Sequence, residues 1–348
     1  RGLFHTRISP LVNVHRLLPR DVVQDVATDE ALPLACREGF VRQVLGWREF
    51  MWHVHRETDG LREWPQARSA PKRWPQLQHV PQASEPGDGG WSTWTGRRWN
   101  RALTASGEAI PRTTNGDCAT ATPSSGAGAV DDGAGAGGAA GVASGAAVDG
   151  GACPNALGAT RPLPPAYWGT ESGMACLDTV VRSVWEEAWS HHITRLMVLG
   201  NVATLMGYRP RELTDWFWVA YLDAFDWVVE PNVLGMGTFA LGDAFLTKPY
   251  VSGSNYLDKM GDYCRGCAFD PKSTCPFGPL YWAFLQTHAE LLAANPRMGV
   301  VLRSLARRPA ERRARDLAVR ERVAELLAKG ERLTPENLAE PAESTASD

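Results

Sequence analysis

Apolar residues recur at helical spacing along most of the chain outside one long central segment. Near the start, Phe40, Val44 and Trp47 follow one another at i, i+4 and i+7, and Pro19 can open a helix. Later stretches with the same spacing cover 180–199, 210–228, 279–294 and 303–332. Loops between these later helices are expected at Gly235, Gly237, Gly242 and Gly253. Because strand signals are scarce, the pattern predicts an all-α fold.

The central segment has a different composition from the rest of the chain. Residues 126–151 are nearly all Gly, Ala, Ser, Val and Asp, and they carry too little bulky apolar surface to form a core. We therefore predict a disordered insertion over 80–153. The helical domain is expected in two parts, 1–79 and 154–333, with a tail over 334–348.

The net charge and the composition exclude few classes of protein. The 348 residues have a net charge of −3, which argues against a broadly basic protein but leaves room for one local nucleic-acid-binding face. No apolar run approaches the roughly 18 residues of a membrane span, so no membrane contact is expected. Tryptophan is unusually frequent at 14 residues, and it serves packing more often than electron transfer. The chain opens without Met, and we expect an upstream part to be missing.

Three of the seven cysteines are close together in the sequence. Cys264 and Cys267 form a CxxC pair, and Cys275 is followed by proline, an arrangement typical of metal sites in a reducing compartment. A fourth ligand is needed, and spacing leaves Cys36 and Cys176 open. Structural zinc and unliganded thiols are the alternatives to an iron–sulfur cluster. The remaining cysteines, which lie in or beside the insertion, are Cys118 and Cys153.

Several sequence strings resemble the photolyase/cryptochrome family, and in combination they are highly specific. His5-Thr-Arg-Ile-Ser-Pro10 is similar to the family's T-S-x-L-S-P flavin-phosphate segment, and the segment 40–50 contains the W-R-E-F motif. The segments 191–197 and 221–227 resemble those that hold the flavin ring. Residues 236–298 point to the clade of iron–sulfur bacterial cryptochromes and photolyases, the prokaryotic (6-4) photolyases. The resemblance covers about 1–56 and 156–310.

The resemblance implies a photolyase-type all-α FAD-binding domain with a [4Fe–4S] cluster. It implies that an upstream α/β domain, which carries the antenna chromophore in the family, is absent here. It also selects Cys176 as the fourth cluster ligand, because in the clade this cysteine shortly follows the motif that reads Leu163-Pro-Pro-Ala-Tyr-Trp168. The interval from Cys267 to Cys275 is several residues shorter than is usual in the family.

The flavin ligands expected from the motifs combine hydroxyl donors with charged groups. Thr6 and Ser9 would contact the diphosphate, with Arg48 as a further contact. Arg195 and Asp223 match the family positions that pair beside the flavin ring, although each could form an ordinary surface ion pair instead.

The resemblance also assigns electron-transfer and lesion-side residues. Trp168 and Trp216 match the clade's electron relay, whereas Phe217 replaces a commoner tyrosine. His191 and His192 match the lesion-side pair, and a helix would direct them about 100° apart. His192 is expected to face the lesion and to supply a proton. The position that faces flavin N5 falls at Val229, where related proteins carry a polar group.

Three functions are compatible with these motifs. The first is a deoxyribodipyrimidine photolyase-type lyase that repairs UV-damaged DNA by electron transfer from photoexcited reduced FAD, with the (6-4) lesion favoured. The second is a blue-light photoreceptor without repair activity. The departures at Val229 and Phe217 and the long insertion favour this alternative. The third is a degenerate structural relative. We expect a soluble intracellular monomer, and an organelle is compatible with the sequence.

Overall fold

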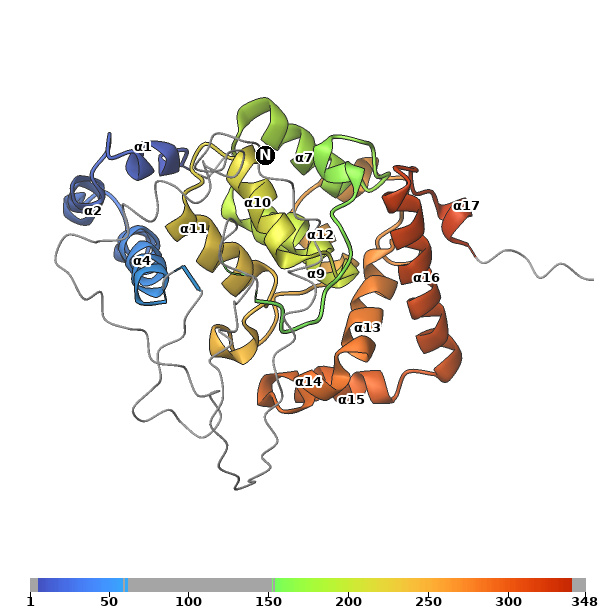
Figure 1. The fold of residues 1–348 in the computed structure, drawn as a ribbon. Helices are drawn as coiled ribbons and strands as arrows, with labels where there is room; N and C mark the ends of the chain where they lie inside the picture. The colour runs from blue at the N-terminus through green and yellow to red at the C-terminus, as the bar shows by residue number, and fades with distance from the viewer. Residues whose placement is uncertain (1–5, 59, 62–151, 153, 340–348) are drawn as a thin grey trace, which may run out of the picture.

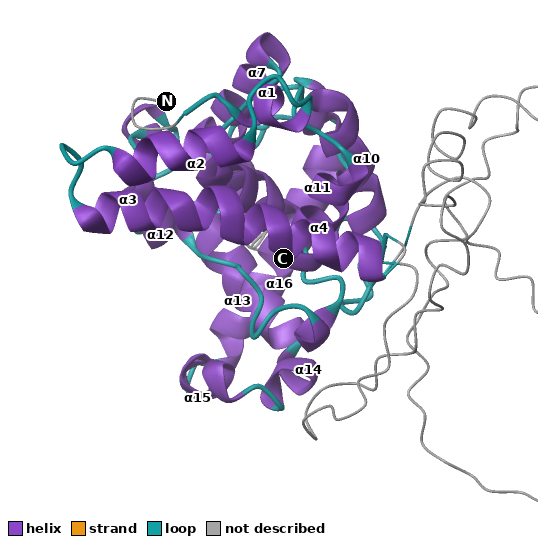
Figure 2. Ribbon diagram, turned by 90° about the vertical axis from the view of Figure 1, so that its left-hand side faces the viewer, coloured by secondary structure: helices purple, strands orange, loops and turns teal. Residues whose placement is uncertain are grey.

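A computed structural model describes residues 6–58, 60–61, 152 and 154–339. These residues form helices joined by loops, and none of them lies in a β-strand (Figure 2). The all-α prediction is therefore confirmed. Apart from residue 152, the predicted insertion over 80–153 lies outside the described residues, as does the end of the predicted tail. No helix in the described ranges has both the length and the apolar character needed to cross a bilayer.

The first group of helices packs against a helix from much later in the chain. The group comprises α1 (Ser9–Asn13), α2 (Pro19–Thr28), α3 (Leu34–Val41), the π-helix η1 (Arg42–Trp47) and α4 (Arg48–Glu57). Pro19 occupies the first helical position of α2, where its missing N–H costs nothing. The most extensive contact with the rest of the fold is made by α4, which packs on α11 (Asp226–Glu230) (Figure 1).

The second part of the chain supplies the larger group of helices. Its first members are η3 (Pro165–Trp168), α7 (Ala175–Glu187), α8 (His192–Thr194), η4 (Arg195–Gly200), α9 (Asn201–Met206) and α10 (Pro210–Ala220). After α11 follow η5 (Pro231–Gly237), η6 (Gly242–Ala244), α12 (Ser254–Met260), η7 (Tyr263–Gly266), α13 (Phe277–Thr287), α14 (Ala289–Ala293), η8 (Pro296–Met298), α15 (Gly299–Ala306), α16 (Ala310–Ala328) and α17 (Pro335–Leu338). Near the end, α13 and α16 lie side by side (Figure 1).

The stretches predicted as continuous helices are interrupted in the structure. Between α7 and α8 the chain turns at Ala188, whose φ of 49° is left-handed. Between α10 and α11, Tyr221 adopts an extended backbone. Pro309 separates α15 from α16 because proline has no N–H to continue the helical ladder. Apolar periodicity continues across these breaks because the helices on both sides face the same core.

Three of the glycines predicted to lie in loops are instead helical. Gly235 and Gly237 belong to the π-helix η5, and Gly242 begins the short helix η6, so that prediction is wrong for all three. A Cβ atom on Gly235 would lie 2.6 Å from the Phe245 ring, so the glycine lets an aromatic side chain pack against the backbone. Regular structure also continues slightly past residue 333, because Thr334 and Asn337 form a capping box at the start of α17.

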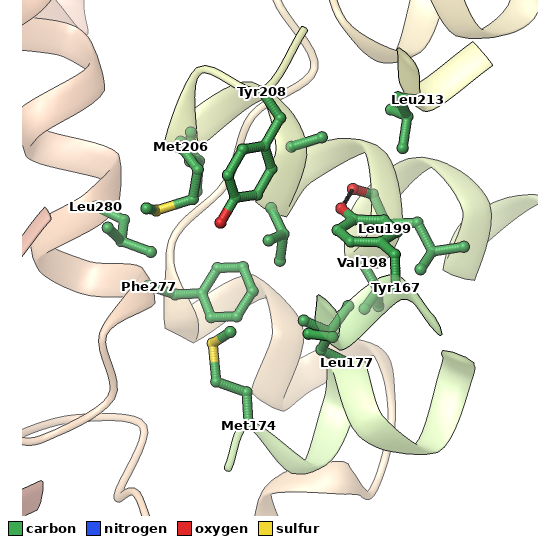
Figure 3. Packing of buried hydrophobic residues seen from close by; sticks show 14 of the residues in the cluster. Tyr167, Met174, Leu177, Val198, Leu199, Met206, Tyr208, Leu213, Phe277 and Leu280 are labelled. Atoms are coloured by element: carbon green, nitrogen blue, oxygen red, sulfur yellow. Dashed lines mark hydrogen bonds between the residues drawn. The ribbon is translucent and has the colours of Figure 1, made fainter. Parts of the chain in front are cut away.

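One apolar core joins segments that are far apart in sequence. Tyr167, Leu177 and Phe277 are fully buried in it, and Figure 3 shows them beside residues of η4 and α9. The Tyr167 hydroxyl donates to the carbonyl of Leu199 at 2.8 Å, which satisfies its polar group inside the core. The core therefore fixes η3, α7 and η4 relative to one another, and these elements lead directly into the candidate sites.

Candidate functional site

A buried carboxylate joins the N-terminal helices to the second group. Asp223, which is 4% exposed, accepts two hydrogen bonds from the Arg195 guanidinium at 2.9 and 2.8 Å. The Ser9 hydroxyl donates to the same carboxylate at 2.6 Å. Arg195 also donates through Nε to the carbonyl of Ser190, and its guanidinium lies 4.1 Å from the ring centre of Tyr221. The paired geometry predicted for Arg195 and Asp223 is present, and it is buried.

Asn13 extends this arrangement to a second arginine. Its amide donates to the carbonyl of Asp223 at 2.8 Å, and its Oδ1 accepts from Arg48 at 2.8 Å. The Arg48 guanidinium lies 4.6 Å from the ring centre of Trp227, and burial lowers the pKa of this arginine. We call the five connected residues the Asp223 network; they are Ser9, Asn13, Arg48, Arg195 and Asp223.

The structure thus brings together four of the five predicted flavin ligands. Thr6 is exposed and precedes the network in the chain. Sequence reasoning missed Asn13, although it lies four residues after Ser9 and would share its helix face. Val229 is 5% exposed on α11, and the neighbouring Glu230 accepts from Arg211 at 3.0 Å inside the protein.

The four predicted cluster cysteines converge from three segments. Cys176 is buried in the first turn of α7, Cys264 and Cys267 lie in and after η7, and Cys275 precedes α13. These four residues are the cysteine group. Burial raises the pKa of the Cys176 thiol, and the other three thiols raise it further. The pKa of Cys275 is raised to about 12, again first by burial and then by Cys264 and Cys267. Cys36 is exposed on α3.

The short interval between Cys267 and Cys275 is closed by a turn centred on Asp270. The Asp270 carboxylate accepts from the backbone N–H groups of Lys272 and Ser273 at 3.0 and 2.9 Å. Its carbonyl accepts from the N–H of Cys275 at 2.9 Å. The turn therefore returns the chain to the cysteine group within the few residues available.

The described residues show no preformed metal-ion site at the cysteine group. Within the described ranges, no three His, Cys, Asp or Glu side chains come close enough together to hold a single ion. Four zinc ligands would each stand about 2.3 Å from one centre. In a [4Fe–4S] cluster the thiolates surround a larger body of several irons.

The two histidines differ in environment. His191 precedes α8 with an extended backbone (φ −76°, ψ 162°), so the prediction that a helix orients both rings is wrong. His191 lines a small cavity together with Arg7, Trp189 and Tyr263. His192 is the first residue of α8 and is exposed. Of the two histidines, His192 is therefore the more exposed.

The predicted relay tryptophans lie at different depths. Trp216 is 1% exposed and Trp168 is 53% exposed. Trp216 donates its indole N–H to the carbonyl of Tyr167 at 2.9 Å, and its ring meets Phe217 edge-on with 5.3 Å between centroids. In the described part of the chain, no aromatic ring packs against Trp168.

Two curated proteins show sequence similarity to parts of the chain. A protein named (6-4) photolyase, from Agrobacterium fabrum, is 43% identical over 143 residues, which is 40% of this chain and 28% of that protein. The uncharacterized protein R855 of Acanthamoeba polyphaga mimivirus is 39% identical over 66 residues, which is 19% of this chain and 54% of that protein. No family model matches the chain.

Over 40% of its length the chain is similar to a member of the photolyase/cryptochrome family.

The similarity to a photolyase points to FAD as the cofactor, and the Asp223 network fits such a group. FAD combines an anionic diphosphate with a planar ring, and the network offers two guanidinium groups, a hydroxyl and an amide in half-buried positions around the buried Asp223. An arginine held bidentately by a carboxylate has a fixed plane, which suits orientation of a ring. The photolyase/cryptochrome match spans under a third of the first relative, so activity and substrate are matters for proposal.

Proposed function

We propose that the chain is the FAD-binding part of a light-driven DNA-repair lyase of the deoxyribodipyrimidine photolyase type. The (6-4) photoproduct is the favoured lesion, damaged DNA is the partner, and the protein acts as a monomer. The observation that carries the proposal is the Asp223 network, because it joins residues of the family's flavin motifs around one buried carboxylate. Similarity to a protein named (6-4) photolyase supports the choice of lesion.

Bound FAD would supply the light absorption and the one-electron donation that repair requires. Within this chain, Arg195 and Asp223 would hold the plane of the ring. Thr6 and Arg48 would bind the diphosphate through a hydroxyl and a charged donor, whereas the single hydroxyl proton of Ser9 is donated to Asp223. Because the Arg195–Asp223 pair is anchored to Ser190 and Ser9, the ring would be oriented without reorganisation of the protein.

The exposed histidine next to this site would provide the proton chemistry. His192 lies three residues before Arg195, so a lesion that reaches its imidazole would also lie near the proposed ring site. An imidazole titrates near neutral pH and can donate a proton to an oxygen that leaves one base for the other. His191, which lines the small cavity, would be the second choice for this role.

We also propose that the cysteine group holds a [4Fe–4S] cluster of the iron–sulfur clade. The proposal is supported by the raised pKa values of Cys176 and Cys275, each of which is raised further by other thiols of the group. Four thiolates would each bind one iron. Since the group joins α7, η7 and the start of α13, the cluster would connect segments that lie about a hundred residues apart, as a structural element.

Repair of a defined lesion tests the function. Purified protein should absorb in the blue through noncovalently bound FAD, and the flavin-reduced protein should restore thymines in an oligonucleotide that carries one (6-4) photoproduct under blue light. His192→Ala should retain FAD but lose repair by at least about 10²-fold, the typical contribution of a general acid. Chromatography of the digested oligonucleotide measures the product.

His53→Ala provides the matched control, because this histidine is also exposed but lies on α4. It should repair at the parent rate. A parent that binds FAD but repairs neither a (6-4) nor a cyclobutane lesion would favour the photoreceptor alternative. Repair by His192→Ala at the parent rate would contradict the role of this histidine alone.

Elemental analysis tests the cluster. Iron and sulfide should be present in equal amounts, and Cys176→Ala should lose both and unfold at a lower denaturant concentration, because the cluster links distant segments. Cys36→Ala, which changes an exposed thiol on α3, should keep the parent's iron content. Zinc in place of iron, or full iron in Cys176→Ala, would contradict the assignment.

A further inference from the structure

A continuous row of aromatic rings leads from the surface to Arg195. Trp185, on α7, is 45% exposed, and its ring lies 6.3 Å from that of Trp216. Trp216 meets Tyr221 edge-on at 6.1 Å, and Tyr221 stacks on Phe217 at 5.1 Å with 10° between the planes. The Arg195 guanidinium covers the Tyr221 ring. The row therefore connects solvent to the Asp223 network through three ring contacts and the cation–π contact between Tyr221 and Arg195.

One backbone oxygen holds the two indoles of this row. Trp185 and Trp216 both donate Nε1–H to the carbonyl of Tyr167, at 3.0 and 2.9 Å. A carbonyl oxygen has two lone pairs and can accept both bonds. Because the Tyr167 side chain is fully buried, this oxygen is a fixed point, and it sets the two rings at 85° to each other. Trp185 is thus positioned against Trp216 by the core itself.

We propose that Trp185 is the surface end of the path that supplies electrons to the flavin, with Trp216 as the intermediate carrier. This inference rests on the proposed flavin function. One electron passes from Trp216 to the light-excited flavin, and one electron from Trp185 restores Trp216. Trp185 then releases its indole proton to water and becomes a neutral radical. A thiol in solution returns one electron and one proton to this radical, and it becomes a thiyl radical.

The environments of the two indoles set the direction of this transfer. Trp216 is 1% exposed, and a positive charge on a buried, unsolvated ring is costly. The Arg195 cation at the inner end of the row also repels a positive charge in that direction. Trp185 is accessible to water, which stabilises the oxidised ring and accepts its proton. The positive charge therefore moves outward to Trp185, and its return to the flavin becomes slow.

Time-resolved absorption after a blue flash tests the path. The parent should show a long-lived neutral tryptophan radical. In Trp185→Phe the radical should decay within a much shorter time, and reduction of the flavin by thiol under steady light should slow several-fold. Flavin content should stay at the parent value and the unfolding midpoint should fall only slightly, because phenylalanine keeps the apolar contact and loses one hydrogen bond to Tyr167. Trp185→Tyr, which keeps an oxidisable ring, should recover part of the rate.

Trp282→Phe is the matched control, since this indole lies on α13 beneath Arg308 and outside the row. It should reduce flavin at the parent rate. A flavin-loaded Trp185→Phe protein with the parent's radical lifetime and rate would overturn the inference while leaving the proposed function intact. Loss of the long-lived radical in Trp168→Phe but not in Trp185→Phe would overturn it as well. Failure of the parent to hold FAD would overturn the proposed function, and this inference with it.

Discussion

Replacement of Asp223 by alanine is expected to leave the purified protein without bound flavin and to destabilise its fold. Asp223 accepts two bonds from Arg195 and one from Ser9, and all three are lost together. The Arg195 side chain, 21% exposed, would remain as a largely buried charge without its partner. Removing one member of a buried ion pair costs about 3–5 kcal/mol of unfolding free energy.

Urea denaturation of the flavin-free protein isolates the structural part of this effect, and absorbance in the blue follows retention of the cofactor. Two variants calibrate the result. Ser9→Ala removes a single bond to the charged carboxylate and should cost about 1.5–3 kcal/mol. Glu321→Ala breaks an exposed ion pair with Arg161 and should cost about 0–1 kcal/mol. Parent levels of flavin in Asp223→Ala would contradict the placement of the ring at this network.

Substitution of Gly173 by alanine is expected to lower the unfolding free energy by more than about 4 kcal/mol, an exceptional loss for a single added methyl group. Gly173 has a φ of 84°, and a Cβ atom there would lie 2.1 Å from the carbonyl oxygen of Leu333. That oxygen cannot move easily, because Leu333 is fully buried and its N–H donates to the carbonyl of Ser172 at 2.9 Å. Relief of the clash would require the segment after α16 to separate from the loop before α7.

Gly173 also borders the cysteine group, so the loss should extend to the cluster. Its N–H donates to Asp178 at 3.0 Å, and its carbonyl lies 4.0 Å from the Cys267 sulfur. We expect Gly173→Ala to lose iron as well as stability.

Gly169→Ala is the matched control for this prediction. Gly169 also has a positive φ, 99°, but a Cβ atom there would meet nothing within 4 Å. Only the backbone conformation is penalised, at about 1–3 kcal/mol. Chemical denaturation and iron analysis of both variants would test the comparison. Equal losses in the two would show that the contact with Leu333 is not the cause.

Several features of the fold and of the site could be predicted from residues that are neighbours in the sequence. Helical periodicity predicted the fold class, and Pro19 marked the start of α2, because both depend on residues within a few turns of each other. The cysteine spacing marked one side of the proposed metal site for the same reason. Family motifs then identified four members of the Asp223 network, and the ion pair between Arg195 and Asp223 confirms that these two positions meet.

The tertiary structure alone decided how these pieces connect. Ser9 and Asp223 are 214 positions apart, and the bond between them exists because α1 packs near the segment before α11. Asn13 links Asp223 to Arg48 because the fold brings both residues beside it. Trp185 and Trp216 lie together because both donate to the carbonyl of Tyr167. A local pattern records which face of a helix is apolar, but every apolar face carries nearly the same signal. Which faces meet is decided by packing of the whole chain, and that choice selected the residues of the site.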